Sequence, residues 1–279
     1  MDQVMTSAAH LSVILPQIWS QLYYQTLLAN IAFNSIVSRD YEGEIQNLGD
    51  TVKISKFPEF DDAIELDEDA RADASALTVT QQSLVINKRI VKDYIVTNKA
   101  LLQSLPMMDK LRDHAIYAIQ KKIQANIIAD TVPNAAAPDH SIAYTSGTTL
   151  ALADLLASKK LLDAQNVPMS DRHLIVGANQ LNDIFNITGF TSSDFITAGS
   201  PLTTGELPPA LLGFAPHFTT VVANVVFLFH SSYFTVAAQK GVTVQEYDLG
   251  VDGKRANRVN VDTLYGQKQL DGLRVVTIG

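Results

Sequence analysis

The sequence contains no cysteine, so a disulfide, a thiol nucleophile and a cysteine-ligated metal are all excluded. The first lysine or arginine is Arg39, and without a basic stretch near the start we expect no secretory signal peptide. Uninterrupted apolar runs reach only about five residues, whereas a membrane-spanning helix needs roughly 18. These absences favour a protein with neither a secretion signal nor a membrane span.

Charged residues are also scarce: they make up 18% of the chain, against about 25% in typical soluble proteins. Hydrophobic residues make up 47% and the mean hydropathy is +0.08, which excludes disorder as the dominant state. We expect a chain this apolar to cover part of its surface with other subunits. The formal net charge of −8 argues against a groove that clamps nucleic acid through its phosphates.

The N-terminal part of the chain is an apolar arm, in which Asp2 is the only charged residue before Arg39. From Pro16 onward apolar residues recur at helical spacing, and proline is well tolerated at the start of a helix. Trp19 and Tyr23 lie in this stretch and are candidate contacts with another subunit. We expect such an arm to pack on its own body or on a neighbouring copy.

An acidic segment lies between two stretches that alternate polar and apolar side chains. Residues 51–55 and the stretch from 77 towards 86 have this alternation, which predicts two strands. The connection, residues 58–76, contains eight acids and a single base, Arg71. Like charges this close repel each other and extend the chain. We therefore predict a projecting hairpin with an acidic tip, which depends on contact with a partner because an isolated hairpin is only marginally stable.

Six acids of this tip are candidate contacts between subunits: Asp61, Asp62, Glu65, Asp67, Glu68 and Asp69. Their candidate partners are basic residues of a neighbouring copy: Lys88, Arg89, Lys92, Lys121, Lys122, Lys254, Arg255 and Arg258. Exposed ion pairs contribute only about 0–1 kcal/mol each, so such a latch needs several pairs together. Calcium is an alternative ligand for clustered carboxylates, but the glycine and the spacing of the EF-hand loop are missing here.

The rest of the chain alternates between runs of helix and runs of strand. Apolar residues at steps of three or four predict a long helix over 105–130, and shorter helices are expected near 152–162 and over 179–185. We read residues 189–216 mostly as loop, because they are rich in Gly, Pro, Ser and Thr. Strands are predicted at 174–176, 218–223, 225–229, 233–238, 242–247, 258–262 and 274–278. This pattern indicates the α+β class.

We find no catalytic motif with convincing spacing: the phosphate-binding loop, the nucleophile elbow and the dinucleotide fingerprint are all absent. Asp139 and His140 are adjacent, but two neighbouring residues do not by themselves form a metal or catalytic site. We therefore expect no enzyme activity, no bound metal and no cofactor. The alternative is a soluble small-molecule enzyme whose site lies near Asp139 and His140, or includes His173 or His217.

Five short segments follow one another in a characteristic order: PQIWS at 16–20, YEGEI at 41–45, GDTVKI at 49–54, RHLIV at 172–176 and LLGF at 211–214. The third segment leads into the predicted hairpin, and the predicted long helix lies between the third and the fourth segments. This order resembles the major capsid (coat) proteins of tailed bacteriophages, which have the Hong Kong 97-type fold. The resemblance covers most of the chain and depends on the order of the segments, because each motif alone is weakly specific.

The resemblance implies a division of the chain. It comprises an N-terminal arm (1–47), an extended β-hairpin loop (48–88), a peripheral domain with a long spine helix (89–143), an axial domain (144–236) and strands that return to the peripheral domain (237–279). The loop would lie across an adjacent subunit, and the axial domain would meet its copies at the centre of each capsomer.

The resemblance also implies a function. Copies would assemble in the host cytoplasm into pentamers and hexamers and form the icosahedral capsid of a virion. The shell would enclose double-stranded DNA without sequence-specific contacts, and portal, scaffolding or decoration proteins would be further partners. An alternative with the same fold is an encapsulin-like compartment, whose shells would contain a cargo protein in place of DNA.

Overall fold

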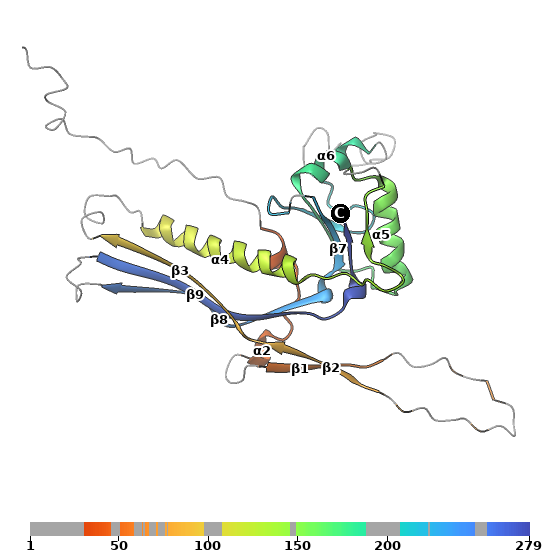
Figure 1. The fold of residues 1–279 in the computed structure, drawn as a ribbon, viewed down its shortest axis with the longest axis horizontal. Coiled ribbons are helices and arrows are strands. Elements are labelled where there is room, and N and C mark those ends of the chain that lie inside the picture. Colours follow the sequence, from red (N-terminus) through yellow and green to blue (C-terminus); the bar gives the residue numbers. More distant parts are fainter. Residues whose placement is uncertain are drawn as a thin grey trace, which may run out of the picture.

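The protein is described here by a computed structural model that covers residues 31–45, 51–58, 63, 65–66, 71, 76, 78–97, 108–145, 149–187, 207–222, 224–248 and 256–279. These residues form a two-stranded, a three-stranded and a five-stranded sheet. Figure 1 shows an elongated molecule, in which the three-stranded sheet and the longest helix extend from a compact end that holds the five-stranded sheet. The arrangement confirms the predicted α+β class.

The three-stranded sheet is antiparallel and carries the long helix α4 (Met108–Asp130) on one face (Figure 1). Its strands, in spatial order, are β3 (Lys88–Thr97), β9 (Ala256–Gln269) and β8 (Phe234–Asp248). On α4, Ala115 and Ile119 are buried in one cluster with Val259 and Val261 of β9. Both helix residues belong to the apolar stripe in the sequence, so the predicted long helix is confirmed.

The five-stranded sheet is buried on both faces. Its strands, in spatial order, are β4 (Ser141–Ile142), β10 (Val275–Ile278), β7 (Val226–His230), β5 (Arg172–Val176) and β6 (Ala215–Phe218). Two helices cover one face, α5 (Leu152–Ala164) and α6 (Ala178–Asn186). On that face Leu174 shares a buried cluster with Leu155 of α5. On the other face Phe229 stacks on Phe33, with ring centroids 5.7 Å apart.

The hairpin consists of β1 (Thr51–Lys56) and β2 (Thr80–Val85), which pair antiparallel as the sequence predicted. Its base packs near α2 (Glu42–Ile45), where Leu84 is buried in a cluster with Leu264 of β9. Gly266 of β9 faces this base so closely that a Cβ atom there would lie 2.5 Å from the carbonyl oxygen of Val85. The hairpin is therefore attached directly to the three-stranded sheet.

A buried side chain connects three separate segments. The amide oxygen of Gln124 on α4 accepts a hydrogen bond from the backbone N–H of Ala32 at 3.1 Å. The amide nitrogen of Gln124 donates to the hydroxyl of Thr219 at 3.0 Å.

Short 3-10 turns occur at η1 (Phe33–Ser35), η2 (Ser231–Tyr233) and η4 (Gly272–Arg274). In the part of the chain that is described, no helix combines the length and apolar character needed to cross a membrane.

The structure differs from the sequence predictions at four strands. The strand predicted at 218–223 is wrong: β6 runs from Ala215 to Phe218, and its Pro216 is tolerated because β6 is an edge strand that pairs only with β5. The strands predicted at 233–238 and 242–247 are one continuous strand, β8, whose register shifts at Lys240 break the alternation. Finally, neither β3 nor the short β4 was predicted.

Candidate inter-subunit surface

The three-stranded sheet has one face that α4 does not cover, which we call the outer face. Because paired residues in an antiparallel sheet point to the same side, the register assigns its members. They are Arg89, Val91, Asp93 and Ile95 of β3, Arg258, Asn260, Asp262 and Leu264 of β9, and Lys240, Thr243, Gln245 and Tyr247 of β8. The hairpin base packs on Leu264, and beyond it Ile95 and Tyr247 are 63% and 50% exposed.

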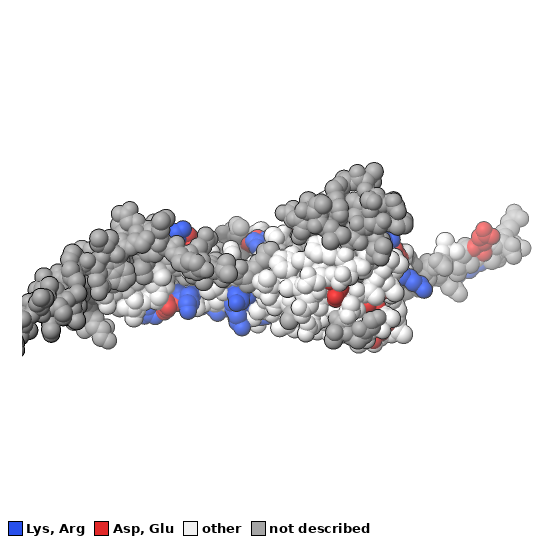
Figure 2. Space-filling model, turned by 90° about the horizontal axis from the view of Figure 1, so that it is seen from above, with Lys and Arg blue, Asp and Glu red and all other residues white. Residues whose placement is uncertain are grey.

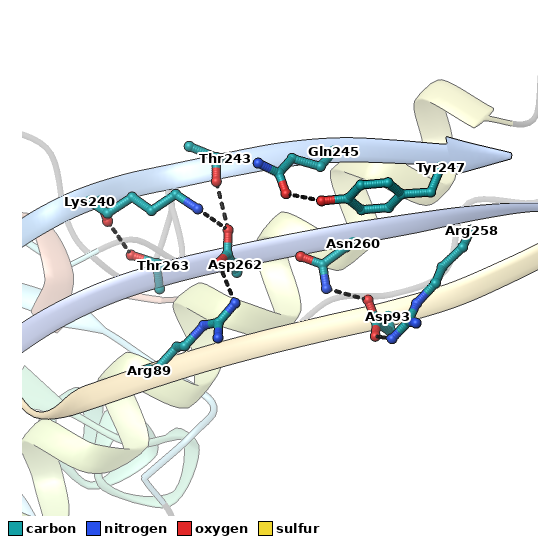
Figure 3. Close-up of polar contacts among 10 residues, drawn as sticks. All are labelled: Arg89, Asp93, Lys240, Thr243, Gln245, Tyr247, Arg258, Asn260, Asp262 and Thr263. Carbon is teal, nitrogen blue, oxygen red and sulfur yellow. Dashed lines mark hydrogen bonds and ion pairs between the residues drawn. The ribbon is translucent and has the colours of Figure 1, made fainter.

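One polar network on the outer face is centred on Asp262 (Figure 3). Its carboxylate accepts hydrogen bonds from Lys240 at 2.7 Å, from Thr243 at 2.7 Å and from Arg89 at 3.0 Å. The bonds from Lys240 and Thr243, with a smaller effect from Arg89, lower the pKa of Asp262 from 3.8 to about 2. The carboxylate is thus ionised and held in place at neutral pH, while Arg89 remains 64% exposed in its side chain.

A second network lies farther along the same face and is centred on Asp93 (Figure 3). Asp93 accepts a hydrogen bond from Asn260 at 2.6 Å and forms an ion pair with Arg258. The hydrogen bond from Arg258 holds the pKa of Asp93 below its ordinary value. Beside it, the hydroxyl of Tyr247 donates to Gln245.

A hollow of about 400 Å³ lies between the two networks. It is lined by Arg89, Gln245, Tyr247, Arg258 and Asn260. Its walls are cationic, amide and phenolic groups that already satisfy part of their hydrogen-bonding capacity within the chain. Such a surface is suited to holding polar and acidic groups of another chain, with exposed Val91 and Ile95 providing apolar contact area beside them.

The described residues include only some of the residues that the sequence predicts to contact another subunit. Outside the described residues lie Trp19, Tyr23, Asp61, Asp62, Asp67, Glu68, Asp69, Lys254 and Arg255. Glu65 is described and is exposed on the hairpin. Of the predicted basic partners, Arg89 and Arg258 belong to the outer face, whereas Lys88 is paired with Asp130 of α4 at 2.6 Å. Sequence reasoning proposed these bases but could not show which of them share a face.

The residues of the alternative enzyme site form two separate groups, Asp139 with His140 and His173 with His217. His140 is buried and its Nδ1 lies 3.0 Å from the carbonyl oxygen of Val275, while the Asp139 carboxylate accepts from the backbone N–H of Ser141. These contacts hold the chain before and through β4. His173 and His217, in contrast, are in direct contact, a pairing that their separation in the sequence did not reveal. Among the described residues, no three His, Asp or Glu side chains converge to hold a metal.

An elongated chain with one open sheet face is typical of structural proteins that complete their surfaces by association. The phage capsid protein family matches residues 86–278, well over half of the sequence, and the chain therefore belongs to this family. It is a major capsid protein, a component of the shell of a virion. The resemblance seen in the sequence is confirmed.

Solved structures with the same fold come from several phages. A structure from Mycobacterium phage Che8 is 22% identical with a TM-score of 0.76, over 95% of this chain and 97% of that one. The capsid structure of the cyanophage P-SCSP1u is 11% identical with a TM-score of 0.76, over 98% and 94%. A structure from Mycobacterium phage Bobi is 13% identical with a TM-score of 0.71, over 99% and 98%. No curated protein matches the chain.

Proposed function

We propose that this major capsid protein is the repeating subunit of an icosahedral phage shell, in which its copies form pentamers and hexamers. The observation that carries the proposal is the outer face, which the described residues leave open beyond the hairpin base. The hairpin adds exposed apolar side chains of its own, Phe57 at 68% and Leu66 at 47%. Surfaces of this kind on a single chain mark sites of association.

Within such a shell we assign the segments as the family resemblance suggests. The N-terminal arm (1–47) packs on a body or a neighbour, and the loop (48–88) lies across an adjacent subunit. The helix α4 is the spine of the peripheral domain (89–143), to which residues 237–279 return through β8 and β9 before β10 joins the five-stranded sheet. The axial domain (144–236) meets its copies at the capsomer centre. In support of this division, the five-stranded sheet shares one cluster with α5 and α6, and β9 shares another with α4, although a third cluster joins the two sheets.

The acidic segment supplies a specific contact in this scheme. Eight acids against Arg71 give residues 58–76 a strong negative charge. The outer face carries three cations, Lys240, Arg89 and Arg258, against the carboxylates of Asp93 and Asp262. We infer that acids of one copy reach the hollow on the outer face of the next, where Arg89 and Arg258 have donors to offer. Because each exposed pair contributes at most about 1 kcal/mol, several pairs act together.

The contents of the shell are double-stranded DNA, enclosed without sequence-specific contacts. The net charge of −8 supports enclosure over phosphate binding. Figure 2 shows one face on which the basic side chains of the described residues are scattered among uncharged ones. Portal, scaffolding or decoration proteins are further partners in this proposal, and assembly takes place in the host cytoplasm. We infer that the chain has no catalytic activity.

The test is assembly of the purified protein, observed by negative-stain electron microscopy and sedimentation. The wild type should form capsomers or shells, and a lasting monomer would overturn the proposed function. Nucleic acid recovered from particles made during phage growth supports a phage shell. A cargo protein in its place identifies an encapsulin-like compartment.

The acidic contact is tested separately by neutralising the six tip acids together. The variant carries Asp61→Asn, Asp62→Asn, Glu65→Gln, Asp67→Asn, Glu68→Gln and Asp69→Asn. We expect a severalfold lower yield of shells, with a weaker dependence of assembly on salt because the screened pairs are gone. The pair Arg89→Gln and Arg258→Gln should act similarly, whereas Lys110→Gln on α4 and Lys160→Gln on α5, which are exposed and lie outside the predicted contact set, serve as the matched control. A wild-type yield from the sextuple variant rejects the contact but leaves the shell function standing.

A further inference from the structure

Two histidines meet at the edge of the five-stranded sheet, in a contact that the capsid function does not use. His173 lies on β5 and His217 on the adjacent parallel edge strand β6, two register positions apart, where His173 pairs with Ala215 and His217 with Ile175. The Nδ1 atom of His173 lies 3.2 Å from the Nε2 atom of His217. Both side chains are half-buried, so the pair is held by the sheet and is still open on one side.

This separation suits two ligands of one metal ion. Nitrogen ligands lie about 2.0–2.1 Å from a tetrahedral zinc ion, which places two of them roughly 3.3 Å apart. The observed 3.2 Å between the two nitrogens is close to that value. A neutral pair without metal would hold the same spacing by an N–H···N hydrogen bond, which requires one ring to donate and the other to accept.

The surroundings keep both imidazoles in the form that binds metals. Burial lowers the pKa of His173 to about 4, with a further lowering from His217 and His230 and an opposing effect of Asp171. Burial also lowers the pKa of His217. On the β7 side, the ring of Phe229 lies 5.9 Å from that of His173 and adds an apolar wall. Since only neutral imidazole binds a metal, few protons compete for the pair at neutral pH.

We propose that His173 and His217 chelate one divalent zinc ion per chain through Nδ1 and Nε2, with water filling the remaining coordination positions. No third His, Asp or Glu converges with them among the described residues, so the site is an open one. The proposal is independent of the shell, because both ligands come from one chain. Other divalent ions that prefer imidazole ligands, such as nickel, should bind at the same site.

The experiment is calorimetric titration of the purified full chain with zinc chloride at neutral pH. We expect one site per chain. Either His173→Gln or His217→Gln should weaken binding at least about tenfold, because the second contact of a chelate is made at high effective concentration. His114→Gln on α4 is the matched control and should bind as the wild type does. If a double variant with both His173→Gln and His217→Gln binds zinc as the wild type does, the two histidines form a hydrogen bond only. That result would contradict the proposal.

A second measurement needs no variant and covers the case in which a substitution prevents folding. Diethyl pyrocarbonate modifies accessible imidazoles, and mass spectrometry reports the modification at each histidine. Zinc should protect His173 and His217 severalfold in the wild-type protein and leave His114 unchanged. Protection of other histidines alone, or of none, contradicts the proposal.

Discussion

The two larger sheets of this protein differ in how many of their faces are buried by the chain itself. The five-stranded sheet is closed by its own chain, with Leu174 facing α5 and Phe229 facing the segment around Phe33. The three-stranded sheet buries Val259 beneath α4 but presents Arg258 and its neighbours on the outer face. The first is a finished core, and we propose that the second is half of an interface. In that proposal, the open face is the part of the molecule that a neighbouring copy completes.

The burial patterns of the individual strands show the same difference. Strand β7 is buried at every position, as expected for a strand covered on both faces. Strand β9 alternates over residues 258–262, where Arg258, Asn260 and Asp262 share one side and Val259 and Val261 the other. An alternating strand has one dry face and one polar face. On the outer face the polar side is organised into two networks, which gives it a defined pattern of charge for a partner to match.

The largest expected effect comes from a substitution in the closed sheet. Phe229→Ala removes a fully buried ring that contacts Phe33 and Tyr233, and we expect it to lower the free energy of unfolding by about 3–5 kcal/mol. Ile95→Ala on the outer face, where the side chain is 63% exposed, should change it by less than about 0.5 kcal/mol. Urea denaturation of the unassembled chain measures both. Similar losses from the two substitutions would contradict the division into a finished core and an open face.

An intermediate effect is expected where the hairpin joins the open sheet. Gly266→Ala would place a Cβ atom 2.5 Å from the Val85 carbonyl oxygen and 3.0 Å from its carbonyl carbon, so the backbone of β2 must move. Such overpacking costs about 1–3 kcal/mol. Hydrogen exchange should increase in β2 and not in the five-stranded sheet. Gly241→Ala is the control, because nothing lies within 4 Å of its added methyl group; equal exchange in the two variants would disprove the tight junction.

Much of the fold could be read from local sequence patterns. The long helix followed from its apolar stripe, because Ala115, Ile119 and Ile127 recur at helical spacing and are all buried. Strand β3 was missed because it is charged over much of its length and lies at a sheet edge, so neither face gives a clear apolar signal. Strand β8 was read as two strands because its register shifts interrupt the period of two.

The candidate surface was less accessible to sequence reasoning. Acidic and basic residues could be nominated, but only the pairing of β3 with β9 brings Asp93 beside Arg258, at a separation of 165 residues. The contact of His173 with His217 depends in the same way on the pairing of β5 with β6. Such contacts are set by long-range strand register, which a single sequence does not encode in any local period.

The smallest expected effect distinguishes the two sheets by their response to acid. In the five-stranded sheet, the folded pKa of His173 lies at about 4, below the ordinary 6.5, so the unfolded chain takes up a proton first between these values. Stability should therefore decrease as the pH falls from about 6.5 towards 4. Because the side chain is only half-buried, solvent screening keeps the total loss below about 1 kcal/mol.

In the three-stranded sheet the corresponding window is lower. Asp262 has a folded pKa of about 2 against an ordinary 3.8, so its stabilising contribution is complete above 3.8 and is lost as the pH falls towards 2. Free energies of unfolding measured against pH, with a chelator present to exclude metal, check both windows. His173→Gln should flatten only the upper one and Asp262→Asn only the lower one. If either substitution flattens the other window, the two sheets do not respond to acid independently, because the charges of one are coupled to the folding of the other.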